Sequence, residues 1–88
     1  KSLSEEETAL QFDVIAYPNP SYSDFMLAII STDDIPAEAR VFNSAGQPME
    51  NLRSNDKSLR MGLEWKAGVY IVEVVQGINR KTIKVIKY

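Results

Sequence analysis

Along most of its length the chain alternates between short runs of strand-forming residues and short clusters of turn-forming residues. Runs rich in Val, Ile, Tyr and Phe are separated by Pro, Asn, Asp, Ser and Gly, with turns roughly every 8–12 residues. No stretch carries a helical apolar period long enough to compete with this pattern. The sequence therefore predicts an all-β fold built from many short strands.

Seven runs are predicted to be strands. They cover Phe12–Tyr17, Phe25–Ser31, Glu38–Phe42, Pro48–Leu52, Ser58–Leu63, Val69–Val75 and Lys81–Lys87. Turns are predicted at Asn43–Gly46, where Gly46 is free to adopt a positive φ, at Asn55-Asp56 and at Gln76–Asn79. Pro48 lacks an N–H for a hydrogen-bond ladder, so the strand that it begins is expected at a sheet edge.

The chain length restricts how these strands can be arranged. With 88 residues the chain forms one domain, and there is no room for the helical crossovers that parallel strands require. We therefore predict a two-sheet antiparallel β-sandwich of about seven strands, immunoglobulin-like in architecture, with a small barrel as the alternative. The Cys…Trp…Cys pattern of antibody domains is absent, so any likeness to them is one of architecture only.

The period-two alternation also assigns the side chains of the core. The predicted inner layer consists of Phe25, Leu27, Val41, Tyr70, Val72, Ile83 and Val85. In the second strand the opposite face, with Met26, Ala28 and Ile30, is apolar as well, which would allow that strand to be covered on both sides.

The first residues differ in texture from the rest. Residues 1–11 contain three successive glutamates and little apolar periodicity, and they are interpreted as a solvated linker; a short helix capped by Ser4 and Glu7 is the alternative. This segment is unlike a signal peptide and lacks an initiator Met, so the chain is expected to be a piece of a longer protein. The predicted organisation is a linker with a processing region at 1–12 and a domain at 13–88. The longest apolar run in the sequence is too short to span a membrane.

Composition argues against an enzyme. The absence of His and Cys removes most common metal sites, Ser-His and Cys nucleophiles, and disulfides. A net charge of −2 offers no footprint for nucleic acid. The glycines occur singly at turns rather than as a phosphate-binding loop. Asp33-Asp34 and Asn55-Asp56 are interpreted as solvated turns, and every lysine as a solvated amine. No metal or cofactor is expected.

Two features remain after this filtering. Trp65, close to Gly68, either plugs the end of the sandwich or forms a platform on which a sugar stacks. The last nine residues, 80–88, contain four basic side chains and no acid. A basic edge strand guards against aggregation, and a basic end can also recognise an acidic partner; spacing alone leaves both open.

Several motifs occur in a characteristic order. They are Tyr17-Pro18-Asn19-Pro20, Phe25-x-Leu27-x-Ile29, Val41-Phe42-Asn43-Ser44-Ala45-Gly46-Gln47, Ala67-Gly68-Val69-Tyr70-Ile71-Val72 and Lys81-Thr82-Ile83-Lys84-Val85-Ile86-Lys87. Residues 13–88 thereby resemble the type A C-terminal sorting domain of the type IX (Por) secretion system of Bacteroidetes. The chain has Ser23-Asp24 where members often have Gly, and Trp65-Lys66 where a Leu-Pro pair is usual. Both departures fall in predicted loops.

The resemblance implies a sorting signal rather than a catalyst. Such domains are attached to the C-terminal side of a secreted cargo, which crosses the inner membrane by its own signal peptide. The folded domain is recognised from the periplasm by the outer-membrane translocon. A surface sortase then removes it, leaving the cargo on the outer-membrane surface or extracellular. Here cleavage would fall within Lys1–Phe12, where extended backbone is accessible.

The resemblance also implies roles for individual residues. Those expected to be exposed and recognised by the translocon are Lys81, Lys84, Lys87 and Tyr88. Those expected to be structural elements of the family motifs are Tyr17, Pro18, Asn19, Pro20, Gly46, Gly68, Val69 and Tyr70.

A rival hypothesis is an immunoglobulin- or fibronectin-like module that binds a ligand or carbohydrate through its end loops. It would use Trp65, Tyr22 and the Asp33-Asp34 loop. A parent protein that starts with a signal peptide and ends at Tyr88 favours sorting, whereas one that continues past Tyr88 favours the binding module.

Overall fold

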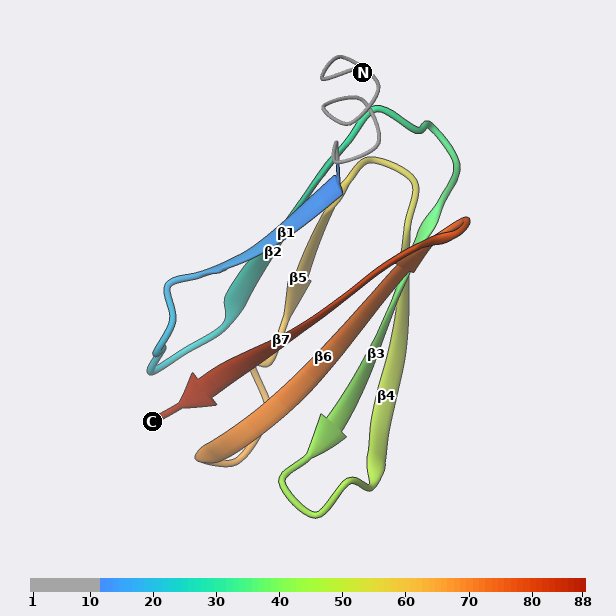
Figure 1. The fold of residues 1–88 in the computed structure, drawn as a ribbon. Helices are drawn as coiled ribbons and strands as arrows, with labels where there is room; N and C mark the ends of the chain where they lie inside the picture. Colours follow the sequence, from blue (N-terminus) through green and yellow to red (C-terminus); the bar gives the residue numbers. More distant parts are fainter. Residues whose placement is uncertain (1–11) are drawn as a thin grey trace, which may run out of the picture.

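The computed structural model describes residues 12–88, which form two antiparallel sheets packed face to face (Figure 1). The strands are β1 (Phe12–Tyr17), β2 (Phe25–Ser31), β3 (Ala37–Asn43), β4 (Pro48–Ser54), β5 (Ser58–Met61), β6 (Gly68–Gln76) and β7 (Asn79–Lys87). One sheet has the order β1-β2-β5 and the other β4-β3-β6-β7. The predicted β-sandwich is confirmed, and the barrel alternative is wrong because the two sheets stay separate. The described residues contain no helix that could cross a membrane.

Strand bounds agree with the sequence pattern at β1 and β2, and β3, β4, β6 and β7 extend beyond it. β7 begins at Asn79 and pairs with β6 from Gln76↔Asn79 to Gly68↔Lys87. The turn between them is therefore only Gly77-Ile78, and Gly77 supplies a φ of 62° at the first central position of this two-residue hairpin. The predicted fifth strand is shorter than expected: it ends at Met61, and Leu63 lies in the following loop, 65% exposed.

Two other sequence predictions about turns and edges are confirmed. Gly46 has a φ of 82° in the β3–β4 hairpin, whose loop is held by the Asn43 side chain: its Oδ1 accepts from the amides of Ala45 and Gln47. The strand that begins at Pro48, β4, is an edge strand of the four-stranded sheet.

The core lies between the two sheets. Every predicted inner-layer residue except Ile83 is buried; Ile83 is half-buried and packs against the core. Val14, Ile29, Ala37, Ala39, Met61 and Val74 complete the buried apolar set. Truncating one of the large members would remove transfer free energy and leave a cavity that neighbouring strands fill only in part.

The outer face of the three-stranded sheet is not covered by other described residues. Met26 and Ala28 are half-buried and Ile30 is 47% exposed, next to Ile15 of β1 at 46%. The expectation that β2 is covered on both sides is therefore not met within residues 12–88. The cause is topological: with β1 and β5 as its neighbours, β2 meets the second sheet on one face only.

Gln76 belongs to β6 rather than to a turn, and it is 1% exposed. Its Nε2 donates to the carbonyl of Ile35 at 2.9 Å, and its Oε1 accepts from the Ser31 hydroxyl. This buried amide fastens the β2–β3 connection to the end of β6, so its burial is matched by hydrogen bonds.

Candidate functional site

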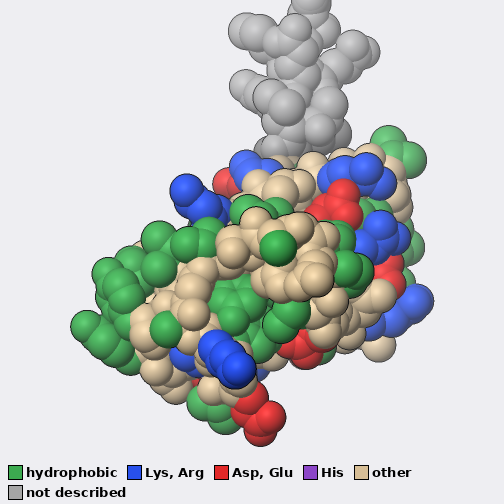
Figure 2. Space-filling view, turned by 90° about the horizontal axis from the view of Figure 1, so that it is seen from below, with side chains coloured by type: hydrophobic (Ala, Val, Ile, Leu, Met, Phe, Trp, Pro, Cys, Tyr) green, Lys and Arg blue, Asp and Glu red, His purple; other side chains and the backbone are tan. Residues whose placement is uncertain are grey.

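The C-terminal strand β7 carries the side chains that the sequence singled out, and it is an edge strand of the four-stranded sheet. Its end lies beside the β1–β2 connection (Figure 1). Figure 2, which looks at the molecule from below, shows hydrophobic side chains gathered toward the side where that connection and the C-terminus lie in Figure 1.

The β1–β2 connection forms a clamp on the free edge of β7, which we define by Asn19 and Ser21. The Asn19 side chain donates to the carbonyl of Lys84 and accepts from the amide of Ile86, both at 3.0 Å. The Ser21 amide donates to Ile86 O at 3.0 Å, and the Tyr88 amide donates to Ser21 O at 2.8 Å. The last residues are thus hydrogen-bonded on both sides, by β6 and by the clamp.

Lys87 is not a solvated amine: it is 6% exposed. Its ammonium donates to the backbone carbonyls of Gly62 and Leu63, in the connection between β5 and β6. The expectations that every lysine is solvated and that Lys87 is exposed are therefore wrong. The physical reason is that a lysine near a strand end can satisfy its charge with carbonyl oxygens across the sandwich, which a charge pattern in the sequence does not reveal.

The remaining cations of β7 divide into paired and free. Arg80 lies 3.4 Å from Glu73, and Lys81 lies 3.0 Å from Asp13 of β1. The pKa of the Asp13 carboxyl is lowered, mainly by the hydrogen bond from Lys81 and then by the Val14 amide. Lys84 is exposed and forms no ion pair with another residue of 12–88. The basic stretch therefore presents less free charge than its composition suggests.

Tyr88 is 57% exposed and contacts Tyr22, whose side chain projects from the β1–β2 connection. Their ring centroids are 4.8 Å apart and their planes are tilted by 47°. Four residues are predicted to be recognised by the translocon. Of these, Lys84 and Tyr88 are exposed, and neither side chain forms an ion pair within residues 12–88.

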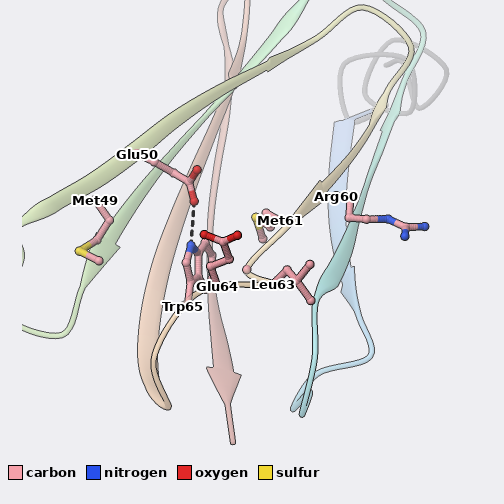
Figure 3. A pocket seen from close by; sticks show the side chains of 8 residues that line it. Met49, Glu50, Arg60, Met61, Leu63, Glu64 and Trp65 are labelled. Carbon is pink, nitrogen blue, oxygen red and sulfur yellow. Dashed lines mark hydrogen bonds between the residues drawn. The ribbon is translucent and has the colours of Figure 1, made fainter.

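Trp65 plugs the open side of the sandwich. Its ring lies 4.5 Å from that of Tyr70 and 5.8 Å from that of Phe25, and its indole N–H donates to Glu50 at 2.7 Å (Figure 3). Sequence reasoning missed Glu50. Glu50 pairs with the buried Val41, so its side chain lies on the face of β4 that points toward the core. There it accepts the hydrogen bond from the indole N–H.

Two parts of the rival binding module, Tyr22 and the Asp33-Asp34 loop, lie at opposite ends of the sandwich. Tyr22 lies beside Tyr88, which directly follows β7, whereas Asp33 contacts Asn79 at the start of that strand. A nine-residue strand separates them by roughly 26 Å. Loop residues at opposite ends of the sandwich do not form one ligand site.

Catalytic and metal chemistry find no matching arrangement in residues 12–88. These residues contain no group of three or more Asp or Glu side chains placed to hold a metal ion. The buried Lys87 donates to two carbonyl oxygens and is not hydrogen-bonded to a serine hydroxyl, so it does not form the Ser-Lys pair of a nucleophilic enzyme.

Comparison with known protein families identifies the family of this chain. A family model described as the secretion system C-terminal sorting domain matches residues 15–88. The chain belongs to this family. It is a type IX C-terminal sorting domain, a class of secretion signal that is generally non-catalytic. A search of curated proteins found no match.

Membership gives the motif residues of this sorting domain a structural interpretation. In the Tyr17–Pro20 motif, Asn19 is part of the clamp and makes two side-chain hydrogen bonds to β7, and Pro18 and Pro20 flank it with no N–H to donate. In the motif that starts β6, Tyr70 is buried and its hydroxyl donates to Lys66 O at 2.6 Å, whereas Val69 points outward, 38% exposed. Gly68 begins the strand. Tyr17 is 51% exposed on the outer face.

Proposed function

We propose that this sorting domain directs its parent protein to the type IX translocon of the outer membrane and is then removed by a surface sortase. The cargo precedes the domain, reaches the periplasm first, and ends on the outer-membrane surface or outside the cell. Membership of the sorting family over residues 15–88 carries this proposal. The proposed processing region lies in residues 1–12, of which 1–11 are outside the described structure.

We further propose that the translocon reads the end of β7. Lys84 and Tyr88 support this, because they are exposed and the clamp holds the backbone on either side of them in a defined position. Lys81 contributes less free charge because Asp13 pairs with it. Lys87 acts from inside by fixing the terminus and does not contact the translocon.

The experiment fuses the chain to a periplasmic reporter in a host with a type IX system and measures the reporter in periplasm and medium. The test variant combines Lys84→Gln with Tyr88→Ala, and the matched control is Lys66→Gln, another exposed lysine. We expect the unmodified fusion and the control to be secreted and the test variant to fold but accumulate in the periplasm.

Two results would contradict the proposal at different levels. If the unmodified fusion stays in the periplasm, the sorting role of this chain is wrong. If the folded test variant is secreted like the unmodified fusion, Lys84 and Tyr88 are not the residues that the translocon reads. Circular dichroism of the purified variant establishes that it is folded.

A further inference from the structure

A cleft of about 580 Å³ opens between β4 and β5, on the side of the sandwich away from β7 (Figure 3). Both strands are sheet edges there, since β4 pairs only with β3 and β5 only with β2. A strand paired on one side directs alternate N–H and C=O groups to the other, so each edge has backbone groups free for a further strand. We define the cleft by Met49, Glu50, Met61, Leu63, Glu64 and Trp65.

The walls of the cleft are apolar and partly exposed. Met49 of β4 is 46% exposed and Leu63, in the loop after β5, is 65% exposed; the half-buried indole of Trp65 lies between them (Figure 3). Exposed apolar side chains grouped around a concave surface mark a binding site more often than scattered ones do.

The charge of the cleft is negative. No Lys or Arg of residues 12–88 forms an ion pair with Glu50 or Glu64, whereas Asp13, Asp24 and Glu73 elsewhere are paired. Arg60 lies at the rim, but its side chain points away from Trp65 toward the outer face, where it lies 3.5 Å from Asp24 (Figure 3). Two carboxylates beside an indole favour a cation, and guanidinium also stacks on aromatic rings.

The floor of the cleft is fixed rather than adaptable. Gly62 has a φ of 90°, and a Cβ there would lie 2.8 Å from the Phe25 ring. Its carbonyl accepts from the Trp65 amide and from the buried ammonium of Lys87. The loop that positions Leu63, Glu64 and Trp65 is therefore held by the core, which reduces the ordering cost of binding.

We propose that this cleft binds an extended segment of a partner protein that carries an arginine flanked, two residues away on each side, by apolar side chains. Residues two apart in a strand point to the same face, so the arginine and its apolar neighbours would enter the cleft together. The guanidinium lies against Trp65, Glu50 and Glu64, and the apolar side chains contact Met49 and Leu63. The segment adds to the free edge of β5 by backbone hydrogen bonds.

The test uses the purified full chain and two blocked hexapeptides, Ac-Thr-Leu-Thr-Arg-Thr-Leu-NH2 and the same peptide with Glu in place of Arg. Trp65 is the chain's one tryptophan, so its fluorescence reports on the cleft directly. We expect a saturable change with the Arg peptide that weakens as salt is added, and none with the Glu peptide. Amide chemical shifts should change along β5 and the loop after it.

Charge variants locate the interaction. Replacing Glu64 by Gln should weaken binding of the Arg peptide about two- to fivefold, the range expected for one exposed ion pair. The matched control Glu38→Gln changes a carboxylate on the outer face of β3, paired with Arg40, and should leave binding unchanged.

Three outcomes would overturn the proposal. They are no saturable response to the Arg peptide, equal binding of the Arg and Glu peptides, and a response to cellohexaose without one to the Arg peptide. The last would identify Trp65 as a sugar platform instead. Because the assay uses purified protein, its outcome is independent of whether the chain supports secretion.

Discussion

At the scale of single residues, the least expected feature is the buried ammonium of Lys87. We predict that Lys87→Met, which keeps an unbranched apolar stem, lowers the free energy of unfolding by about 1–3 kcal/mol, because the charge-assisted bonds to Gly62 O and Leu63 O are lost. Urea unfolding monitored by Trp65 fluorescence measures the change. Lys84→Met on the exposed face of the same strand is the matched control and should stay within ~0.5 kcal/mol. Equal effects of the two substitutions would show that the Lys87 bonds do not stabilise the fold.

The ion pair between β1 and β7 should be visible as a pH dependence. The pKa of Asp13 lies below its ordinary value of 3.8 because Lys81, and then the Val14 amide, donate hydrogen bonds to the carboxylate. A carboxyl whose pKa is lowered by folding stabilises the protein above its unfolded-state pKa, and this contribution disappears as pH falls through the folded-state pKa. In Lys81→Gln the pKa of Asp13 should rise toward 3.8, and the variant should lose less stability on acidification. Carboxyl titration by NMR measures the pKa of Asp13 in both proteins, and the difference in stability follows from it by linkage. An unchanged pKa of Asp13 in Lys81→Gln would contradict the assignment of Lys81 as the group that lowers it.

At the scale of elements, β2 offers a direct test of which face points inward. Phe25 is 0% exposed, and Phe25→Ala should cost ~3–5 kcal/mol. Ile30, on the opposite face of the same strand and 47% exposed, is the matched control, and Ile30→Ala should cost about 1 kcal/mol or less. Thermal melting compares the two variants. A Phe25→Ala protein that melts within a few degrees of the unmodified chain would reverse the assigned faces.

The clamp formed by Asn19 and Ser21 gives a second prediction at the scale of elements, which concerns amide hydrogen exchange at Ile86. Asn19→Ala removes both side-chain bonds to β7, so the amide of Ile86 should exchange with solvent faster. Asn19→Asp keeps an acceptor for Ile86 N–H and loses only the donor to Lys84 O, so protection of Ile86 should be largely retained. Amide hydrogen exchange by NMR distinguishes these outcomes. Equal exchange in Asn19→Ala and the unmodified chain would mean that the Asn19 side chain does not hold the strand end.

The sequence predicts the features that depend on neighbouring residues in the chain, and it misses those that depend on contacts between residues far apart in the chain. Period-two alternation places the inner faces of β2, β3 and β6 correctly because burial against one sheet imposes that period on each strand by itself. The burial of Lys87 and the bonds of Asn19 depend on partners more than 20 and more than 60 residues away, and no local pattern encodes them. The extension of β7 back to Asn79 likewise comes from pairing with β6, not from the polar residues that begin it.

At the scale of the whole molecule, the last strand contributes both to the fold and to the proposed recognition. β7 supplies the fully buried Val85, the nine-residue ladder with β6, the Lys87 anchor and the acceptors of the clamp. A domain of this size holds only about 4–13 kcal/mol of stability in total. Loss of export on truncating the terminus therefore does not by itself identify a recognition sequence, because the same truncation removes Val85 from the core and an edge strand from the sheet.

We predict that deleting Lys81–Tyr88 leaves the chain unfolded at room temperature, since Val85 and the β6 ladder are lost together. The matched change is Tyr88→Ala, which keeps β7, Lys87 and the backbone bond to Ser21 and loses only the ring contact with Tyr22. Circular dichroism and thermal melting should show a cooperative β-sheet transition for Tyr88→Ala and none for the deletion. If the deleted chain still melts cooperatively, β7 is dispensable for folding, and export defects from truncation would then report on recognition directly.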